Sequence, residues 1–312
     1  MVFGLAMSWG IPATASPVQR DPSNFVLANG SGSDFQIESP STGKVIKDLG
    51  TIAGYTDNGL AYSPDGQDVY LTVVEPMSLE IERIDVANGR RAFVADGEEP
   101  SISPNGRFLA YGAGPEGSQQ LFVRDLSSGA VRSINLRKLL GGQTDLLTAS
   151  ITWLGNGSEL VVLPGGVGND LMGNPIPAPV PGSCSAVPAS STCLIVVKAR
   201  TGHALTATRV VLHSLRSGYG PIGASGPNLF MAAFHGGHTD MYEAQVTRRR
   251  ASAIHLFSMP AVLPVAFDAR GTKLFYLVGH SPVALWLADV TPHGLDNARM
   301  LNANVALAGL AW

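Results

Sequence analysis

The residues with the most recognisable chemistry are two histidines and an aspartate in the run His235-Gly-Gly-His238-Thr-Asp240. Imidazole nitrogens and a carboxylate are ligands that divalent transition metals accept, so this spacing resembles part of a metal site. The run lies in a Gly-Gly turn, which does not present two imidazoles to one ion as a helical i, i+4 pair does. We therefore expect no metal here and interpret the three side chains as polar tips of a loop. His280, on a neighbouring loop, would bring a third imidazole to the same face.

Three carboxylates form a second group of candidates, and each precedes an apolar segment that is expected to contain strands. Glu98 and Glu99 lead into residues 100–114, and Asp145 lies shortly before residues 150–165. These carboxylates could line a central mouth between sheets, or they could belong to solvated acidic connections. The candidate binding residues on one loop face are therefore Glu98, Glu99, Asp145, His235, His238, Asp240 and His280.

Sequence motifs for nucleophilic or metal-assisted catalysis are missing. The chain has no G-x-S-x-G nucleophile elbow, no H-E-x-x-H metal motif and no Walker-type phosphate loop. We predict a protein that is not an enzyme, with no catalytic residue, no bound metal and no cofactor. A divalent cation on the axis of a ring of sheets stays open as an alternative.

The amino terminus and the two cysteines both indicate a location outside the cytoplasm. Residues 2–12 are apolar and are followed by Ala13-Thr14-Ala15, a small-x-small pattern of the kind that signal peptidase cleaves. We interpret residues 1–19 as a signal peptide, the remnant of a membrane anchor or a flexible tail. Cys184 and Cys193 lie in one Gly/Pro/Ser-rich segment, where we expect a local disulfide; free thiols in a cytosolic protein are the alternative. The predicted location is secreted, periplasmic or in the cell envelope.

The composition favours a fold with many turns and no long helices. The 312 residues include 36 glycines and 21 prolines, while charged residues make up only 14% of the chain. Long solvent-facing helices need charged faces, so a helical bundle is not expected. The formal net charge of −3 lacks the basic character that is typical of nucleic-acid binders. Beyond the amino terminus, no apolar run approaches the roughly 18 residues that a membrane-spanning helix needs.

Two kinds of hairpin turn recur along the chain and would position the candidate residues. The first turn occurs as GLAYSPDGQDVYLTVV (59–74) and PSISPNGRFLAYGAG (100–114), with weaker copies in 150–165, 220–236 and 264–279. The second turn comes about twenty residues later, as IDVANGRRAFV (84–94) and VRDLSSGAVRSI (123–134), with copies in 36–49, 196–207, 243–254 and 287–298. Polar turn residues between alternating apolar runs are typical of β-hairpins.

The second turn occurs six times and the first only five times, which indicates that one unit is divided between the chain ends. Residues 305–312 match the strand that precedes a first turn, and residues 20–30 match the turn itself and the strand after it. We therefore predict that residues 20–312 form one all-β domain, a six-bladed β-propeller of four-stranded antiparallel blades. Pairing of the carboxy-terminal strand with residues 25–28 would close the ring and remove its exposed edges.

The SPDG and SPNG turns, each followed by an apolar strand and then by IDVANG or VRDLSSG, resemble the WD-like repeats of TolB-like propellers. The resemblance covers nearly all of residues 20–312, is most specific in residues 59–134 and fades at residues 220–226. It implies the propeller fold and a role in binding partners. TolB itself has a separate α/β domain before its propeller, for which this chain has no room, so its role in the Tol–Pal envelope system is not implied.

The expected binding face carries the loops between the second and third strands of each blade. These loops are irregular, and the one in the third blade, residues 164–192, is long and proline-rich. It contains Cys184 and ends directly before Cys193. We predict a non-catalytic binding or sensor propeller, a monomer, that recognises a protein, a peptide or a cell-envelope glycan on this face. One alternative is a propeller enzyme of the metal-dependent lactonase or hydrolase type. The other is a structural scaffold of the cell envelope.

Overall fold

The computed structural model describes residues 24–29, 34–114, 120–136, 150–155, 157–163, 191–213, 219–235, 238–247, 251–260, 262–268, 270–279, 283–303 and 307–311. These residues form 24 β-strands and no α-helix. The predicted all-β class is therefore confirmed. The predicted tail 1–19, Asp145, His280, Cys184 and nearly all of the loop 164–192 lie outside the described residues. Of that loop only Ser191 and Thr192 are described, because the next strand already begins at Ser191.

The strands fall into six units of four, numbered here in chain order, with the divided unit last. In units 1 to 5 the four strands are consecutive and antiparallel. Unit 1 contains β4 (Tyr55–Tyr62), β5 (Asp68–Glu75), β6 (Ser78–Asp85) and β7 (Arg91–Asp96). Unit 2 contains β8 (Glu98–Ile102), β9 (Phe108–Ala113), β10 (Gln120–Asp125) and β11 (Val131–Ile134). Unit 3 contains β12 (Ser150–Trp153), β13 (Glu159–Leu163), β14 (Ser191–Lys198) and β15 (Thr206–His213).

Unit 4 contains β16 (Tyr219–Ser225), β17 (Asn228–His235), β18 (His238–Val246) and β19 (Ala251–Pro260). Unit 5 contains β20 (Leu263–Phe267), β21 (Lys273–Val278), β22 (Ala284–Thr291) and β23 (Gly294–Asn302). Unit 6 contains β24 (Leu307–Ala311), β1 (Phe25–Asn29), β2 (Asp34–Glu38) and β3 (Val45–Thr51). In unit 6 the last strand of the chain pairs antiparallel with the first, Leu27 opposite Leu310. Units 3 and 4 are joined into one eight-stranded sheet by a single parallel bridge between Leu212 and Ala251.

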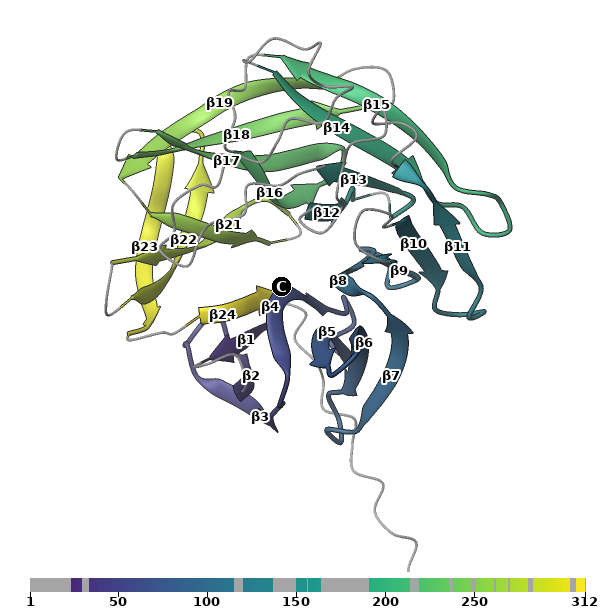
Figure 1. The fold of residues 1–312 in the computed structure, drawn as a ribbon. Helices are drawn as coiled ribbons and strands as arrows, with labels where there is room; N and C mark the ends of the chain where they lie inside the picture. Colours follow the sequence, from purple (N-terminus) through teal and green to yellow (C-terminus); the bar gives the residue numbers. More distant parts are fainter. Residues whose placement is uncertain are drawn as a thin grey trace, which may run out of the picture.

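The units lie around a common centre (Figure 1). Their inner strands contact one another in the order β24, β4, β8, β12, β16 and β20, and β20 also contacts β24. Alternate side chains of each strand point to opposite sheet faces, so each unit can pack against two neighbours. The apolar core is accordingly divided into six clusters, one between each pair of neighbouring units.

Polar residues in the repeated turns explain why the hairpins form where the sequence predicts them. The Ser63 hydroxyl accepts the Asp68 backbone N–H at 2.8 Å, and the Ser103 hydroxyl accepts the Phe108 N–H at the same distance. Asp268 takes the place of this serine in unit 5 and accepts two backbone N–H groups with its carboxylate. Side-chain acceptors that satisfy turn N–H groups stabilise these tight reversals.

The antiparallel order gives the molecule two different faces. We call the face with the first and third hairpin turns the short-turn face. The loops between second and third strands, and the connections between units, lie at the other end of the strands, which we call the middle-loop face. Glu98 and His238 both lie at this end, because Glu98 begins β8 directly after a connection and His238 begins β18 directly after a middle loop.

Candidate functional site

The Glu98–Glu99 pair occupies an irregular position on the inner strand of unit 2. The pairing of β8 with β9 shifts register between Glu98 and Ser101, and Glu99 has a φ of 55°, which is uncommon for a residue other than glycine. The Glu99 N–H donates to the Thr72 hydroxyl of unit 1 at 3.2 Å. Gly59 on β4 has no side chain to displace this backbone, since a Cβ there would lie 2.6 Å from the Glu99 Cα. Neighbouring unit 1 therefore holds the carboxylate pair in place.

Both glutamates line one pocket between units 2 and 3, although consecutive strand residues ordinarily point to opposite faces. The pocket has a volume of about 260 Å³, part of which is open to solvent. Its remaining lining is apolar apart from one amide and one glycine, and comprises Gly112, Gln120, Leu121, Leu136, Ile151 and Val162. The site thus combines two carboxyl groups with apolar walls. The room inside it is close to that of a single water molecule, so it admits a small polar group at most.

Burial changes the protonation of this pair. Glu98 is only 3% exposed, whereas Glu99 is partly exposed, so the pair does not form a fully solvated connection. Desolvation, with a smaller contribution from the negative charge of Glu98, raises the pKa of Glu99 to about 9. Glu99 is therefore protonated at neutral pH, and its carboxyl group can donate a hydrogen bond as well as accept one. The pocket can recognise a partner group that has a hydrogen-bond acceptor, or one that carries positive charge and displaces the proton.

A second polar cluster lies on the outer strands of unit 4. The Asp240 carboxylate accepts a hydrogen bond from the Ser258 hydroxyl at 2.5 Å. The Nε2 atoms of His238 and His255 each lie 3.6 Å from Asp240 Oδ1. The two imidazoles are about half exposed, whereas the Asp240 side chain is only 13% exposed. The predicted loop tip is thus a strand, because β18 already begins at His238.

This cluster does not have the geometry of a nucleophilic triad. In such a triad the serine hydroxyl donates to the histidine, and the histidine donates to the carboxylate through its other nitrogen. Here Ser258 donates to Asp240 directly, and the same His255 nitrogen faces both partners. Among the described residues, no group of three or more His, Cys, Asp or Glu side chains is arranged to hold a metal ion. The cluster is best described as a polar surface on the middle-loop face.

The structure therefore brings together two subsets of the predicted residues and keeps the subsets apart. Glu98 and Glu99 share a pocket in unit 2, while His238 and Asp240 lie in unit 4. His235 ends β17, and its side chain lies outside the described part of the structure, as do Asp145, His280 and the proposed Cys184–Cys193 disulfide. Sequence reasoning missed His255 and Ser258, because only the pairing of β18 with β19 places them beside Asp240.

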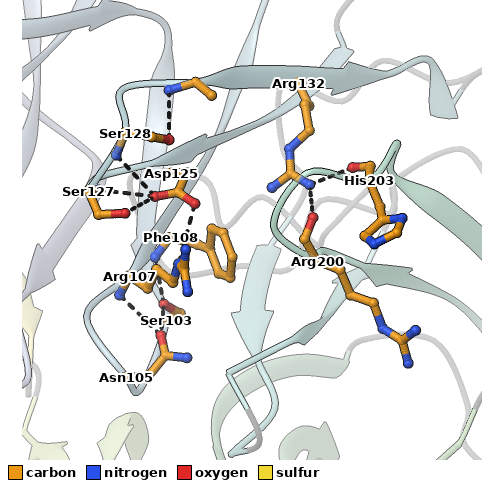
Figure 2. Close-up of polar contacts among 11 residues, drawn as sticks. Ser103, Asn105, Arg107, Phe108, Asp125, Ser127, Ser128, Arg132, Arg200 and His203 are labelled. Atoms are coloured by element: carbon orange, nitrogen blue, oxygen red, sulfur yellow. Dashed lines mark hydrogen bonds and ion pairs between the residues drawn. The ribbon is translucent and has the colours of Figure 1, made fainter.

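Several polar side chains of the short-turn face bond within the fold, as Figure 2 shows for units 2 and 3. The Asp125 carboxylate accepts hydrogen bonds from the Ser127 hydroxyl at 2.6 Å, from two backbone N–H groups and from Arg107. The Ser127 hydroxyl is the main reason why the pKa of Asp125 is lowered. Arg132 extends from β11 to the backbone carbonyls of Arg200 and His203 in the next unit.

The same kind of contact between units recurs elsewhere on the short-turn face. Lys47 of unit 6 donates to the Ala87 carbonyl of unit 1 at 2.7 Å. Arg299 of unit 5 donates to the Ser41 carbonyl at 2.8 Å and to the Pro40 carbonyl of unit 6. Each is a basic side chain on an outer strand that bonds to the last hairpin turn of the following unit. These contacts hold neighbouring units together at their outer edge.

Comparisons with known proteins place this geometry in a recognised fold. No protein-family model matches the sequence, and no curated protein matches it. TolB from Acinetobacter baumannii is similar in structure, with a TM-score of 0.62 at 15% identity over 93% of this chain. This chain covers 65% of that protein's length, which is less than two thirds. Among the described residues, no helix has the length and apolar character needed to cross a membrane.

Two further solved structures are similar to this chain in fold. A putative TolB from Agrobacterium tumefaciens has a TM-score of 0.57 at 14% identity, over 92% of this chain and 90% of its own. A chain of the nidogen/laminin complex has a TM-score of 0.53 at 11% identity, over 92% of this chain and 97% of its own. At such low identity these likenesses concern the fold. The chain therefore has the fold of TolB-like and other β-propeller proteins, as the repeated turns predict.

Proposed function

We propose that this chain is a six-bladed β-propeller, closed by β24, that binds a protein or peptide partner on its middle-loop face without catalysing a reaction. The six apolar clusters between neighbouring units support the blade count, since each unit packs on both sides. The pairing of β24 with β1 and the contact of β20 with β24 support closure. Pairing with β24 covers the edge of β1, which would otherwise be free to pair with other chains.

The observation that carries the proposed function is the difference between the two faces. On the short-turn face, the turns of units 2 and 3 use their polar side chains within the fold, as Asp125 and Arg132 do. On the middle-loop face, the Glu98–Glu99 pocket opens to solvent and the imidazoles of His238 and His255 are half exposed. Binding residues are commonly carried on loops that a rigid scaffold positions. The middle-loop face accordingly combines accessible polar side chains with a pocket, which favours it as the binding face.

A location outside the cytoplasm belongs to the same proposal and rests on the sequence. The apolar residues 2–12 and the following Ala13-Thr14-Ala15 have the order of a secretion signal. Intact mass of the protein recovered from the producing cells, with and without reductant, tests this part. Loss of the first residues and a mass that rises by two hydrogen atoms on reduction support export and the Cys184–Cys193 disulfide. An unprocessed, reduced chain recovered from the cytosol contradicts both.

Site-specific photo-crosslinking in the producing cells tests the binding face. A photoreactive residue is placed on the middle-loop face at Ser78, His238 or Val278, and on the short-turn face at Asn88 or Ser128. We expect adducts of higher mass from the first three positions and none from the other two. Adducts from both faces alike, from the short-turn face alone or from no position would contradict the proposed function.

A further inference from the structure

The loop between β5 and β6, on the middle-loop face of unit 1, exposes an unusual amount of apolar surface. Met77 is 97% exposed, which is the highest value among the large apolar side chains that the structure describes as exposed. Val74 is 50% exposed, and Pro76 between them is exposed as well. Single exposed apolar residues are ordinary, but three within four positions form a continuous patch that a partner can cover. We call these three residues the unit 1 tip.

Carboxylates surround the unit 1 tip. Glu75 ends β5 directly before the turn, and Glu80 lies directly opposite Asp96 on β7. Opposite positions on neighbouring strands bring side chains close together, so two carboxylates there repel each other at a cost in stability. None of the ion pairs among the described residues includes these three carboxylates. Glu80 instead accepts a hydrogen bond from the Ser78 hydroxyl at 3.1 Å, a contact that leaves its negative charge in place.

The basic residues of unit 1 lie at the other end of its strands. Arg83 pairs with Asp68 at 3.7 Å, and Arg91 pairs with Glu82 at 2.5 Å, both toward the short-turn face. The described charges of this unit are therefore separated along the strands, with the acidic excess at the middle-loop end.

We infer that the unit 1 tip is a docking surface for a basic segment of a protein partner, with an apolar side chain that packs on Met77. Lysine or arginine side chains would relieve the repulsion between Glu80 and Asp96, and their alkyl chains would cover Met77 at the turn. The negative charge also disfavours nucleic acid and anionic membranes, which would be repelled. This inference rests on the proposed function, because it names the chemistry of the partner that the middle-loop face binds.

Binding of defined peptides to the purified full chain tests the docking surface. The probe is a fluorescent hexapeptide, Lys-Lys-Leu-Phe-Lys-Lys with blocked ends, and its counterpart has glutamate in place of each lysine. We expect the lysine peptide to bind, with an affinity that falls as salt increases, and the glutamate peptide not to bind. Glu75→Gln and Glu80→Gln should each weaken binding by about threefold, as exposed ion pairs do.

Matched variants on unit 5 distinguish the unit 1 tip from general surface effects. Met77→Ser should weaken binding of the lysine peptide, while Met300→Ser, which alters a methionine that is 52% exposed, should not. Asp296→Asn removes one exposed carboxylate elsewhere and should also leave binding unchanged. Equal losses in the unit 5 variants, or unchanged binding in the unit 1 variants, would overturn the inference.

The peptide and crosslinking results separate failure of the inference from failure of the proposed function. Middle-loop adducts in cells without binding of the lysine peptide would leave the proposed function standing and refute the basic partner. Peptide binding that depends on the unit 1 tip, without middle-loop adducts, would support the surface chemistry and refute the proposed function. Absence of both adducts and peptide binding would refute both.

Discussion

Replacing Glu99 by glutamine should remove part of the pH dependence of the free energy of unfolding. In the folded protein the pKa of Glu99 is about 9, mainly because the side chain is desolvated, whereas its ordinary value is 4.5. A raised carboxyl pKa means that the folded chain holds a proton that the unfolded chain releases between these two values. The resulting stability is complete below the unfolded pKa and is lost as pH rises toward 9.

The magnitude comes from the linkage between protons and folding. Each pH unit within this window lowers the free energy of unfolding by about 1.4 kcal/mol per group, so Glu99 accounts for about 4 kcal/mol between about pH 5 and pH 8. Glutamine is neutral throughout and similar in shape. Glu99→Gln should therefore match the native protein near pH 5 and be more stable by about 4 kcal/mol near pH 8.

Urea unfolding at pH 5, 6, 7 and 8 measures this difference, because groups common to both proteins cancel in the comparison. Glu75→Gln, which removes an exposed carboxylate of unit 1, is the matched control and should keep the native pH profile. Glu98→Gln should lower the pKa of Glu99, because the Glu98 charge is the second cause of the shift. Parallel pH profiles for Glu99→Gln and the native protein would refute the reasoning.

Three further substitutions test the contacts that hold the units and turns. Asp125→Asn removes a carboxylate with four hydrogen bonds and should lower the free energy of unfolding by about 2 kcal/mol at neutral pH. Because the pKa of Asp125 is lowered, this loss should shrink as pH falls through that value, and a constant loss in urea titrations would contradict it. Gly97→Ala should cost about 3 kcal/mol, since its φ is 145° and a Cβ would lie 2.5 Å from the Gly112 carbonyl oxygen. Gly89→Ala, with a φ of 72° and open space, should cost about 1 kcal/mol, and equal thermal shifts for the two glycines would be inconsistent with this account. Arg132→Met keeps the apolar chain but loses the bonds to the next unit, and should cost about 1–2 kcal/mol in urea; an unchanged midpoint would show that the contact is not needed.

Much of the fold was predictable because it depends on local chemistry. The Ser63 and Ser103 turns are determined by side chains that bond to N–H groups four or five residues away. The count of such turns predicts the number of units and the division of one unit between the chain ends. The weak first turn near residues 220–226 is a tight reversal at Ser225–Asn228, where Ser225 pairs directly with Asn228. This reversal lacks the repeated serine that accepts a turn N–H group, which is why the pattern fades there.

The candidate site was predictable only in part, because burial and pairing are not local. The sequence indicates that Glu98 and Glu99 are acidic and precede a strand, but not that Glu98 is buried and Glu99 half-buried. Only the packing of unit 2 against its neighbours removes water from Glu99 and raises its pKa. In the same way, His255 and Ser258 lie 15 and 18 residues from Asp240, and strand register alone brings them to its carboxylate.

By itself the sequence determined the all-β class, the repeated hairpins and the face on which the irregular loops lie, since each depends on residues close together in the chain. The tertiary structure alone decided which carboxyl is desolvated, which basic side chains join neighbouring units, and that Met77 and its acidic surroundings lie uncovered. These properties depend on the exclusion of water and on contacts between distant segments, and neither is encoded in any single stretch of residues.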